Sequence, residues 1–217
     1  QKGHLNIIQL LLGAGSDIHH QNLAGNTTLF QATRARRRKA VKYLLASKAK
    51  VNVANRQQLT PLIAAAYNGD RKTVQLLLSH GADPTLTDQT GKTALVYASG
   101  KGFSKIVGLL LDTGIETSIR YGNELTILMW AAGHSDDVPS QAALKTVKLI
   151  LSKGANPDLV DKRGQTALMI AAEMGHLSIV EHLLGIGAMD DVRDLEGRTA
   201  LDLAESENHA DVAKLLR

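Results

Sequence analysis

The stretch GQTALMIAAEMGHLSIVEHLLGIGA (164–188) contains the signals that decide the fold. Thr166 precedes a short alanine-rich run and is placed to cap a helix with its hydroxyl oxygen. The pair Gly175-His176 interrupts that run, and a second, leucine-rich run follows. Gly187 then stands where a helix commonly ends in a left-handed residue. The stretch therefore predicts two short helices joined by a tight turn.

The same pattern recurs along the whole chain of 217 residues. The threonine that opens each alanine-rich run recurs after 33, 33, 33, 40 and 33 residues, and a leucine-rich motif keeps the same phase. The aligned threonines are Thr27, Thr60, Thr93, Thr126, Thr166 and Thr199. Two motifs locked in register at a fixed period indicate a repeat architecture. We therefore predict copies of one helix pair, each of which buries its apolar face on its neighbour.

These motifs resemble the ankyrin repeats, whose unit carries D-x-x-G-x-T-P-L-H-x-A-A, then G-H, then V-x-L-L-L-x-x-G-A-D. Segments such as QLTPLIAAA (58–66) and LLLSHGAD (76–83) carry the resemblance here. It implies an all-α repeat solenoid of paired antiparallel helices with β-hairpin fingers, in a single domain over residues 1–217. The expected units are a partial repeat at 1–21, repeats at 22–54, 55–87, 88–120, 121–160 (with a seven-residue insertion) and 161–193, and a C-terminal cap repeat at 194–217.

Three features depart from the family pattern. The histidine that follows Thr-Pro-Leu in the family is replaced in every repeat, mostly by an apolar residue, as in bacterial members of the family. The segment GHLNIIQLLLGAG (3–15) has the pattern of a second helix without its first helix, so we expect the natural chain to extend upstream. The seven extra residues around 133–144 predict an exposed loop between two helices, and Pro139 rules out a simple continuation of the first of them.

Composition and charge restrict the class of protein. Aromatic residues make up only 3% of the chain, so a core of Leu, Ile, Val and Ala in thin helical layers is expected. The chain has no Cys, which excludes a disulfide framework and a thiolate metal site. No apolar run approaches the ~18 residues of a membrane span. The net charge of +4 is uneven, because residues 18–69 hold nine Lys and Arg residues and no acid.

The most basic stretch is TRARRRKAVKYLL (33–45). Arg36 occupies the turn position where other repeats have Gly, and a positive φ there costs a non-Gly residue ~1–2 kcal/mol. Cations at the start of the following helix oppose its dipole by ~0.3–1 kcal/mol each. Three interpretations stay open: a solvated edge, a protein interface that selects anions, and a nucleic-acid contact or import signal. No aromatic side chains accompany the arginines to stack on bases.

Other motifs suggest chemistry without supporting it. The segment TGKT (90–93) resembles the end of a phosphate-binding loop, but Leu86 stands where that loop requires Gly. The segment GAGS (13–16) is a helix C-cap. The segment HSDD (134–137) crowds His, Ser and Asp onto one loop, whereas a catalytic triad or a zinc site needs groups held by separate rigid elements. We therefore predict no catalytic residue, no cofactor and no metal.

Individual histidines and the single tryptophan receive structural interpretations. His4, His176 and His209 occupy the Gly-His turn position of the repeat and are expected to support the turn. Trp130 lies in a first helix, and we expect it to pack beneath the inserted loop.

The resemblance to ankyrin repeats implies a non-enzymatic protein–protein interaction module. Such a module binds a macromolecular partner on the concave surface formed by the fingers and the first helices, and the basic side chains here favour an acidic protein segment. The positions that match the family's contact positions, together with the basic cluster, are Arg34, Arg36, Arg37, Arg38, Arg56, Gln57, Tyr67, Asn68, Lys92, Lys101, Arg120 and His134.

Two other functions stay open. The basic region 18–69 could bind an anionic polymer or a lipid surface, or the chain could be the targeting module of a larger enzyme or secreted effector. For partners we expect a protein of unknown identity, no specific nucleic acid and a monomeric chain. The cytoplasm is the default location, with the periplasm or delivery into a host cell open for a bacterial protein.

Overall fold

The chain folds into short helices joined by turns and loops. The computed structural model describes residues 2–135 and 137–217, with side chains from residue 5 onward, and over these residues it contains 13 helices. The chain divides into two compact units, Gln1–Tyr97 and Ala98–Arg217, and the division falls inside one helix. Each unit is described by itself.

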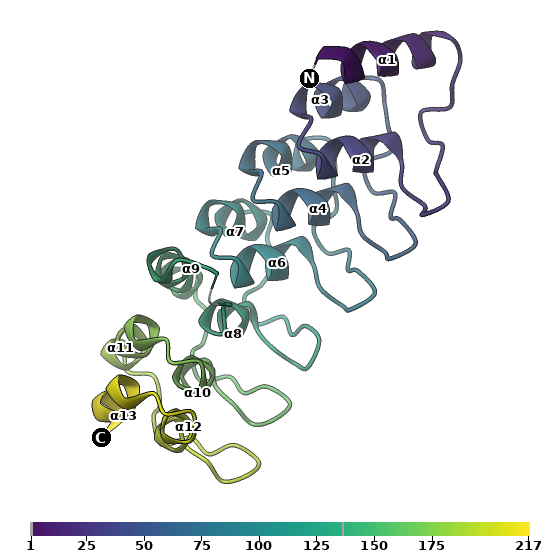
Figure 1. The fold of residues 1–217 in the computed structure, drawn as a ribbon. Helices are drawn as coiled ribbons and strands as arrows, with labels where there is room; N and C mark the ends of the chain where they lie inside the picture. Colours follow the sequence, from purple (N-terminus) through teal and green to yellow (C-terminus); the bar gives the residue numbers. More distant parts are fainter. Residues whose placement is uncertain (1, 136) are drawn as a thin grey trace. The chain divides into compact units, whose positions relative to one another are not determined.

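The first unit consists of successive layers of helices (Figure 1). The partners α2 and α3 pack against each other, as do α4 and α5, and α2 also contacts α4 in the next layer. The helices of this unit are α1 (Lys2–Gly13), α2 (Thr28–Arg34), α3 (Arg38–Ala46), α4 (Pro61–Tyr67), α5 (Arg71–Leu78) and the start of α6 (Ala94–Gly100).

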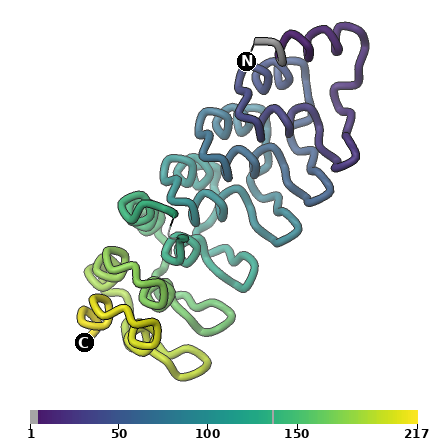
Figure 2. Tube along the Cα trace, in the orientation of Figure 1, coloured from purple at the N-terminus to yellow at the C-terminus, as the bar shows by residue number. Residues whose placement is uncertain are grey.

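The second unit repeats the same arrangement, as the trace in Figure 2 shows. Each of its last three layers pairs a first helix with a second helix that packs on it. Its helices are α7 (Ser104–Leu111), α8 (Ile127–Ala132), α9 (Ser140–Ser152), α10 (Ala167–Glu173), α11 (Leu177–Gly185), α12 (Ala200–Ser206) and α13 (Ala210–Leu216).

The predicted threonine caps are confirmed. Each aligned threonine precedes a first helix, and its Oγ1 accepts a hydrogen bond from the backbone N–H three residues later. The Oγ1–N distances are 3.1 Å at Thr27, 3.2 Å at Thr60, 3.3 Å at Thr93, 3.4 Å at Thr126, 3.2 Å at Thr166 and 3.3 Å at Thr199. These bonds satisfy backbone donors that the first turn of a helix leaves without a partner.

Small and branched apolar side chains fill the space between layers. Ala65 and Ala66 of α4 and Val74 and Leu77 of α5 have no exposed surface. Alanines on the first helices allow close approach of neighbouring helices, and leucines of the second helices, such as Leu44 and Leu77, are fully buried. Deleting such a leucine side chain typically costs ~2–5 kcal/mol. The core is therefore a set of interfaces between layers, as the low aromatic content predicted.

The fingers are held by side chains more than by a β-ladder. Asn55 Oδ1 accepts hydrogen bonds from the N–H groups of Gln57 and Leu59, both at 2.9 Å. Asp88 Oδ1 does the same for Thr90 and Lys92, at 2.8 and 3.1 Å. Over the described residues the β-pairing in the fingers consists of isolated bridges, Gln21↔Thr27 and Tyr121↔Leu125. The expected hairpins are thus tight turns closed by an Asn or Asp side chain.

Backbone hydrogen bonds also join one finger to the next. The N–H of Arg56 donates to the carbonyl of Ala24, and the N–H of Gln89 donates to the carbonyl of Gln57, both at 3.1 Å. Gly25 lies at this contact, and a Cβ there would come within 2.8 Å of the Arg56 nitrogen. Its φ of +76° and the close backbone both require glycine. Neighbouring fingers in the first unit therefore form one hydrogen-bonded row.

The insertion differs from the expected loop. Helix α9 begins at Ser140 and has 13 residues, longer than the other second helices, so residues 140–144 of the predicted loop are helical. Pro139 precedes its first turn, where the missing proline N–H costs no helical hydrogen bond. Val138 is buried, and its Cγ1 would lie 2.8 Å from a Cβ built on Gly102. The insertion therefore lengthens a helix and packs on the preceding repeat.

Among the described residues, no helix has the length and apolar character needed to cross a bilayer.

Among the residues that the structure describes, five non-glycine residues adopt a positive φ, and Lys48 allows a test of the repeat pattern. Lys48 stands at the C-cap position that glycine occupies in five other repeats, the partial first repeat included, with a φ of 63°. Glycine avoids the ~1–2 kcal/mol that a side chain costs there but loses ~0.5–1 kcal/mol more backbone entropy on folding.

We therefore expect Lys48→Gly to raise the free energy of unfolding, measured by urea denaturation, by about 0.5–1 kcal/mol. The control is Lys42→Gly inside α3, which should lower it by about 1 kcal/mol. A destabilised Lys48→Gly protein would contradict the prediction.

Candidate interaction surface

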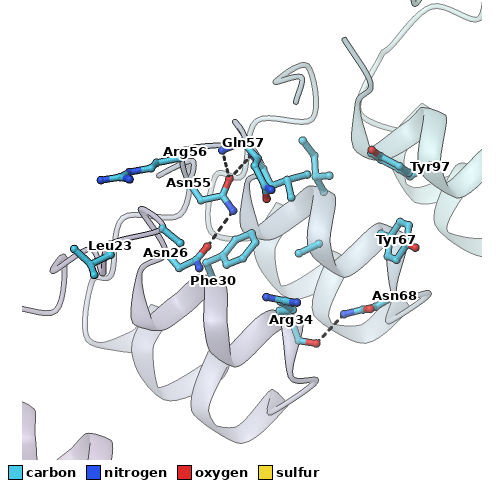
Figure 3. Close-up of a pocket in the computed structure, with 14 residues that line it drawn as sticks. Leu23, Asn26, Phe30, Arg34, Asn55, Arg56, Gln57, Tyr67, Asn68 and Tyr97 are labelled. Atoms are coloured by element: carbon cyan, nitrogen blue, oxygen red, sulfur yellow. Dashed lines mark hydrogen bonds between the residues drawn. The ribbon is translucent and has the colours of Figure 1, made fainter. Parts of the chain in front are cut away.

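A groove of about 810 Å³ lies between the fingers and the first helices of the first unit. Its floor is formed by Phe30 of α2 and Ile63 of α4, which are otherwise buried. Leu23, at a finger tip, and Tyr67, at the end of α4, are its most exposed apolar side chains, at 88% and 52%. Figure 3 shows these residues together with Arg34, Arg56 and Tyr97 around the hollow. We call this feature the groove.

The finger side of the groove is rigid. Asn55 Nδ2 donates a hydrogen bond of 3.0 Å to Asn26 Oδ1, and both side chains are buried. Asn55 Oδ1 accepts hydrogen bonds from the two finger N–H groups. Asn55 Oδ1, Asn55 Nδ2 and Asn26 Oδ1 therefore all have hydrogen-bond partners. The guanidinium of Arg56 and the amide of Gln57 project from this fixed corner to the solvent (Figure 3). A partner would therefore meet pre-positioned polar groups.

Two aromatic rings, Tyr67 and Tyr97, form the third side of the groove. Tyr67 and Tyr97 make an edge-to-face contact, with ring centroids 5.5 Å apart and planes at 80°. The hydroxyl of Tyr97 donates a 2.5 Å hydrogen bond to Asp88 Oδ2, and Lys92 Nζ lies 5.9 Å from the centre of the Tyr97 ring. The hydrogen bond between Tyr97 and Asp88 connects the finger of this repeat to its own first helix. It also holds in place the Tyr97 ring that Tyr67 contacts.

The Asp88–Tyr97 pair has shifted pKa values. Burial and the hydrogen bond to Asp88 raise the pKa of Tyr97 to about 12. Burial alone would raise the pKa of Asp88, but hydrogen bonds from Tyr97, Thr90 and the backbone of Lys92 outweigh burial, so that pKa lies below its ordinary value of 3.8. The carboxylate is therefore ionised, and the phenol neutral, at physiological pH.

Two residues of the predicted basic cluster, Arg36 and Arg38, contact the next repeat. The guanidinium of Arg36 donates to the carbonyl of Asn68, and Arg38 forms an ion pair of 2.7 Å with Asp70. Asp70 is buried and caps α5 through Thr73. Its burial raises its pKa, but the hydrogen bonds from Thr73 and Arg38 outweigh burial and lower it. Arg36 and Arg38 thus hold the next repeat, an interaction that the sequence alone did not indicate.

Arg34 and Asn68 mark the end of the groove that faces the turns between helices. Asn68 Nδ2 donates a 3.1 Å hydrogen bond to the backbone carbonyl of Arg34, as drawn in Figure 3. The side chain of Arg34 stays exposed beside the hollow. Arg34, Arg56, Gln57, Tyr67 and Asn68, all predicted as contact residues, therefore line one groove.

Lys101, Arg120 and His134, which were also predicted as contacts, lie in the second unit. The guanidinium of Arg120 donates to the carbonyls of Glu124, at 3.2 Å, and of Val160, so it bridges two repeats. His134 is only 4% exposed, and its ring stacks on His176 at 3.7 Å between centroids. His134 is therefore almost fully buried against the next repeat, and its role as a contact residue stays a prediction.

The histidines of the Gly-His turns have the expected structural role. The Nε2 of His176 lies 3.0 Å from the carbonyl oxygen of His134, and the Nε2 of His209 lies 3.0 Å from that of Glu173. Each therefore connects one repeat to the end of the preceding first helix. The side chain of His4 lies outside the described residues. Trp130 is half-buried beside Gly100.

The loop that suggested catalytic chemistry is organised differently. His134 Nδ1 lies 3.0 Å from the carbonyl oxygen of Ser135, and the Ser135 hydroxyl donates to Asp137. Asp136 lies outside the described residues. Among the residues that the structure does describe, no group of three or more His, Asp and Glu side chains could hold a metal ion.

Sequence reasoning did not assign Leu23 or Tyr97 to the binding surface. Leu23 belongs to a finger whose tip was not among the predicted contact positions. Tyr97 lines the groove from the next repeat. A signal was present at Asn55, which stands where the family has aspartate. An amide there can donate to Asn26 as well as accept, and this donation fixes the finger corner.

The Asp88–Tyr97 pair predicts a pH-dependent stability. Since the folded-state pKa of Asp88 lies below 3.8, its contribution to stability is complete above that value and is lost as pH falls through the folded value. We expect Asp88→Asn to lower the free energy of unfolding by about 1–3 kcal/mol at about pH 7 and by less at about pH 3. Urea denaturation at the two pH values measures both. Asp17→Asn, an exposed aspartate outside the finger contacts, is the matched control, and an equal loss at both pH values would contradict the prediction.

Comparison with known proteins agrees with the repeat geometry. A chain of the structure titled "Bd0816 Predatory Endopeptidase from Bdellovibrio bacteriovorus in complex with immunity protein Bd3460" is similar, with a TM-score of 0.76 and 27% identity over 91% of this chain and 98% of that chain. No curated protein matches the sequence. The family described as ankyrin repeats (3 copies) matches residues 1–88, 68–140 and 139–217. The chain therefore belongs to the ankyrin-repeat family.

Proposed function

We propose that this chain is a non-enzymatic module that binds an acidic segment of a partner protein in the groove of its first unit. The observation that carries the proposal is the groove itself. It combines an apolar floor, a fixed polar corner and two exposed arginines, Arg34 and Arg56. Tyrosine and arginine are the side chains most often found at the energetic centres of protein interfaces. Tyr67 and Arg34 both lie on its helix side (Figure 3).

The charge of the first unit supports an acidic partner. This unit holds 13 Lys and Arg residues against 4 Asp, a balance of +9, whereas the second holds 12 against 17 acids, a balance of −5. Asp70 and Asp88 are buried and engaged in internal hydrogen bonds. The surface of the first unit is therefore more basic than its composition alone indicates. Such a field accelerates association with acidic partners and disfavours basic ones.

The structural relative also supports protein binding. The similar chain comes from a complex of an endopeptidase with an immunity protein. Ankyrin repeats generally mediate protein–protein interaction, and the present fold offers the same kind of rigid surface. We infer that the chain acts by occupying or positioning another protein, with no chemistry of its own.

A test must separate the groove from general electrostatic attraction. Peptides selected from a displayed random library on the native chain would serve as probes, and fluorescence anisotropy would measure their dissociation constants. We expect Arg34→Glu with Arg56→Glu to weaken binding of the selected peptides more than about tenfold, since each reversal replaces an attraction by a repulsion.

The matched control is Lys42→Glu with Lys50→Glu, which makes the same change of charge at exposed positions outside the groove. It should weaken binding much less. Equal losses in both variants, with a steep salt dependence and no preference among sequences, would instead indicate binding of an anionic polymer or lipid surface through residues 18–69.

A further inference from the structure

Four exposed cations lie at the turns that join the helix pairs of the first unit. Arg37 and Lys39 stand at the start of α3, and Arg71 and Lys72 at the start of α5. Their side chains make no hydrogen bond or ion pair with any other residue that the structure describes. We call these four residues the turn edge. The ion pair between Arg38 and Asp70 holds the starts of α3 and α5 side by side, so the four cations share one edge.

The turn edge carries no acidic group to compensate it. Asp70 is the only acid in this part of the chain, and it is buried and fully engaged by Arg38 and Thr73. Four solvated cations on one edge repel each other and would be neutralised by an anionic partner. A solvated edge needs no such concentration of charge, because scattered charges provide solubility equally well.

The turn edge begins where the groove ends. Arg34 and Asn68 line the last part of the groove, and the chain passes directly from each of them into the turns that lead to α3 and α5. The bonds from Asn68 Nδ2 to the Arg34 carbonyl and from Arg36 to the Asn68 carbonyl join these two turns. An extended segment that leaves the groove past Arg34 therefore meets the turn edge next.

The two surfaces select different side chains. The groove offers the exposed side chain of Leu23 and the half-exposed ring of Tyr67 beside the nearly buried Phe30 and Ile63, so it suits an apolar anchor residue. The turn edge offers guanidinium and ammonium groups alone, and guanidinium groups pair with carboxylates in a two-pronged geometry. Because bases are normally held by stacking on aromatic rings, and the turn edge has none, a protein segment fits better than a nucleic acid.

We propose that the partner segment is bipartite, with one apolar residue anchored in the groove followed on one side by a run of acidic residues that lies across the turn edge. This inference rests on the proposed function and specifies its ligand. The apolar anchor sets the position of the segment, and the acidic run adds affinity and direction.

The experiment uses the full chain and two synthetic peptides. The first is the best binder selected from a displayed random library on the native chain, and the second is the same peptide with every Asp and Glu replaced by Asn or Gln. The turn-edge variant is Lys39→Gln, Arg71→Gln, Lys72→Gln. The control variant is Lys42→Gln, Lys48→Gln, Lys50→Gln, which removes the same charge from exposed positions elsewhere in the same unit. Circular dichroism checks that both fold.

We expect the turn-edge variant to bind the acidic peptide about tenfold more weakly, the size expected for several exposed charge pairs. The neutral peptide should bind native and turn-edge proteins equally, and the control variant should reduce both affinities little. Tyr67→Ala, in the groove, should weaken both peptides.

Three results would overturn the inference. Equal affinity of the acidic and neutral peptides for the native chain would refute the acidic run while leaving groove binding intact. Equal losses in the turn-edge and control variants would show unspecific attraction. Displacement of the peptide by duplex DNA, lost in the turn-edge variant, would identify nucleic acid as the occupant. Peptides that bind but are insensitive to Tyr67→Ala would instead refute the proposed function.

Discussion

The structure depends on the burial of one helix pair against the next. A single pair such as α4 and α5 has apolar side chains on more than one face, and no pair can cover them alone. Ala65 and Ala66 on one side and Leu77 on the other reach zero exposure only because neighbouring layers cover them. The other contacts, including caps, finger bonds and the Arg38–Asp70 pair, set how one layer sits on the next.

Stacking also explains why the candidate site is a surface. Thin layers filled by Ala and Leu leave no room for a deep enclosed cavity, so exposed functional groups must lie on the fingers and helix ends. Asn55 illustrates the link, because it closes its own finger and bonds to Asn26 in the preceding one. The polar corner of the groove is therefore as rigid as the stacking that positions it, and this rigidity reduces the entropy lost on binding.

The sequence predicted what depends on local pattern. Thr60 caps its helix and Arg36 takes a positive φ because both outcomes follow from short-range rules. The contacts of Arg36 and Arg38 with the next repeat depend on side-chain direction across an interface, which the repeat period does not specify. His134 was expected at the surface, but its ring stacks on His176 of the next repeat and is almost fully buried.

Hydrogen exchange of the backbone amides tests the dependence of the groove on stacking most directly. The amides of Arg56 and Gln89 bond to the preceding finger, while those of Asn68 and Asp70 bond within the helix pair of the same repeat. If the stacking of repeats holds both the fingers and the helix pairs, all four amides exchange through one shared unfolding event. They then show equal protection from exchange and equal sensitivity to urea. Fast exchange at Arg56 and Gln89 alone would show that the fingers move independently of the helices, and the account of a pre-positioned groove would be wrong.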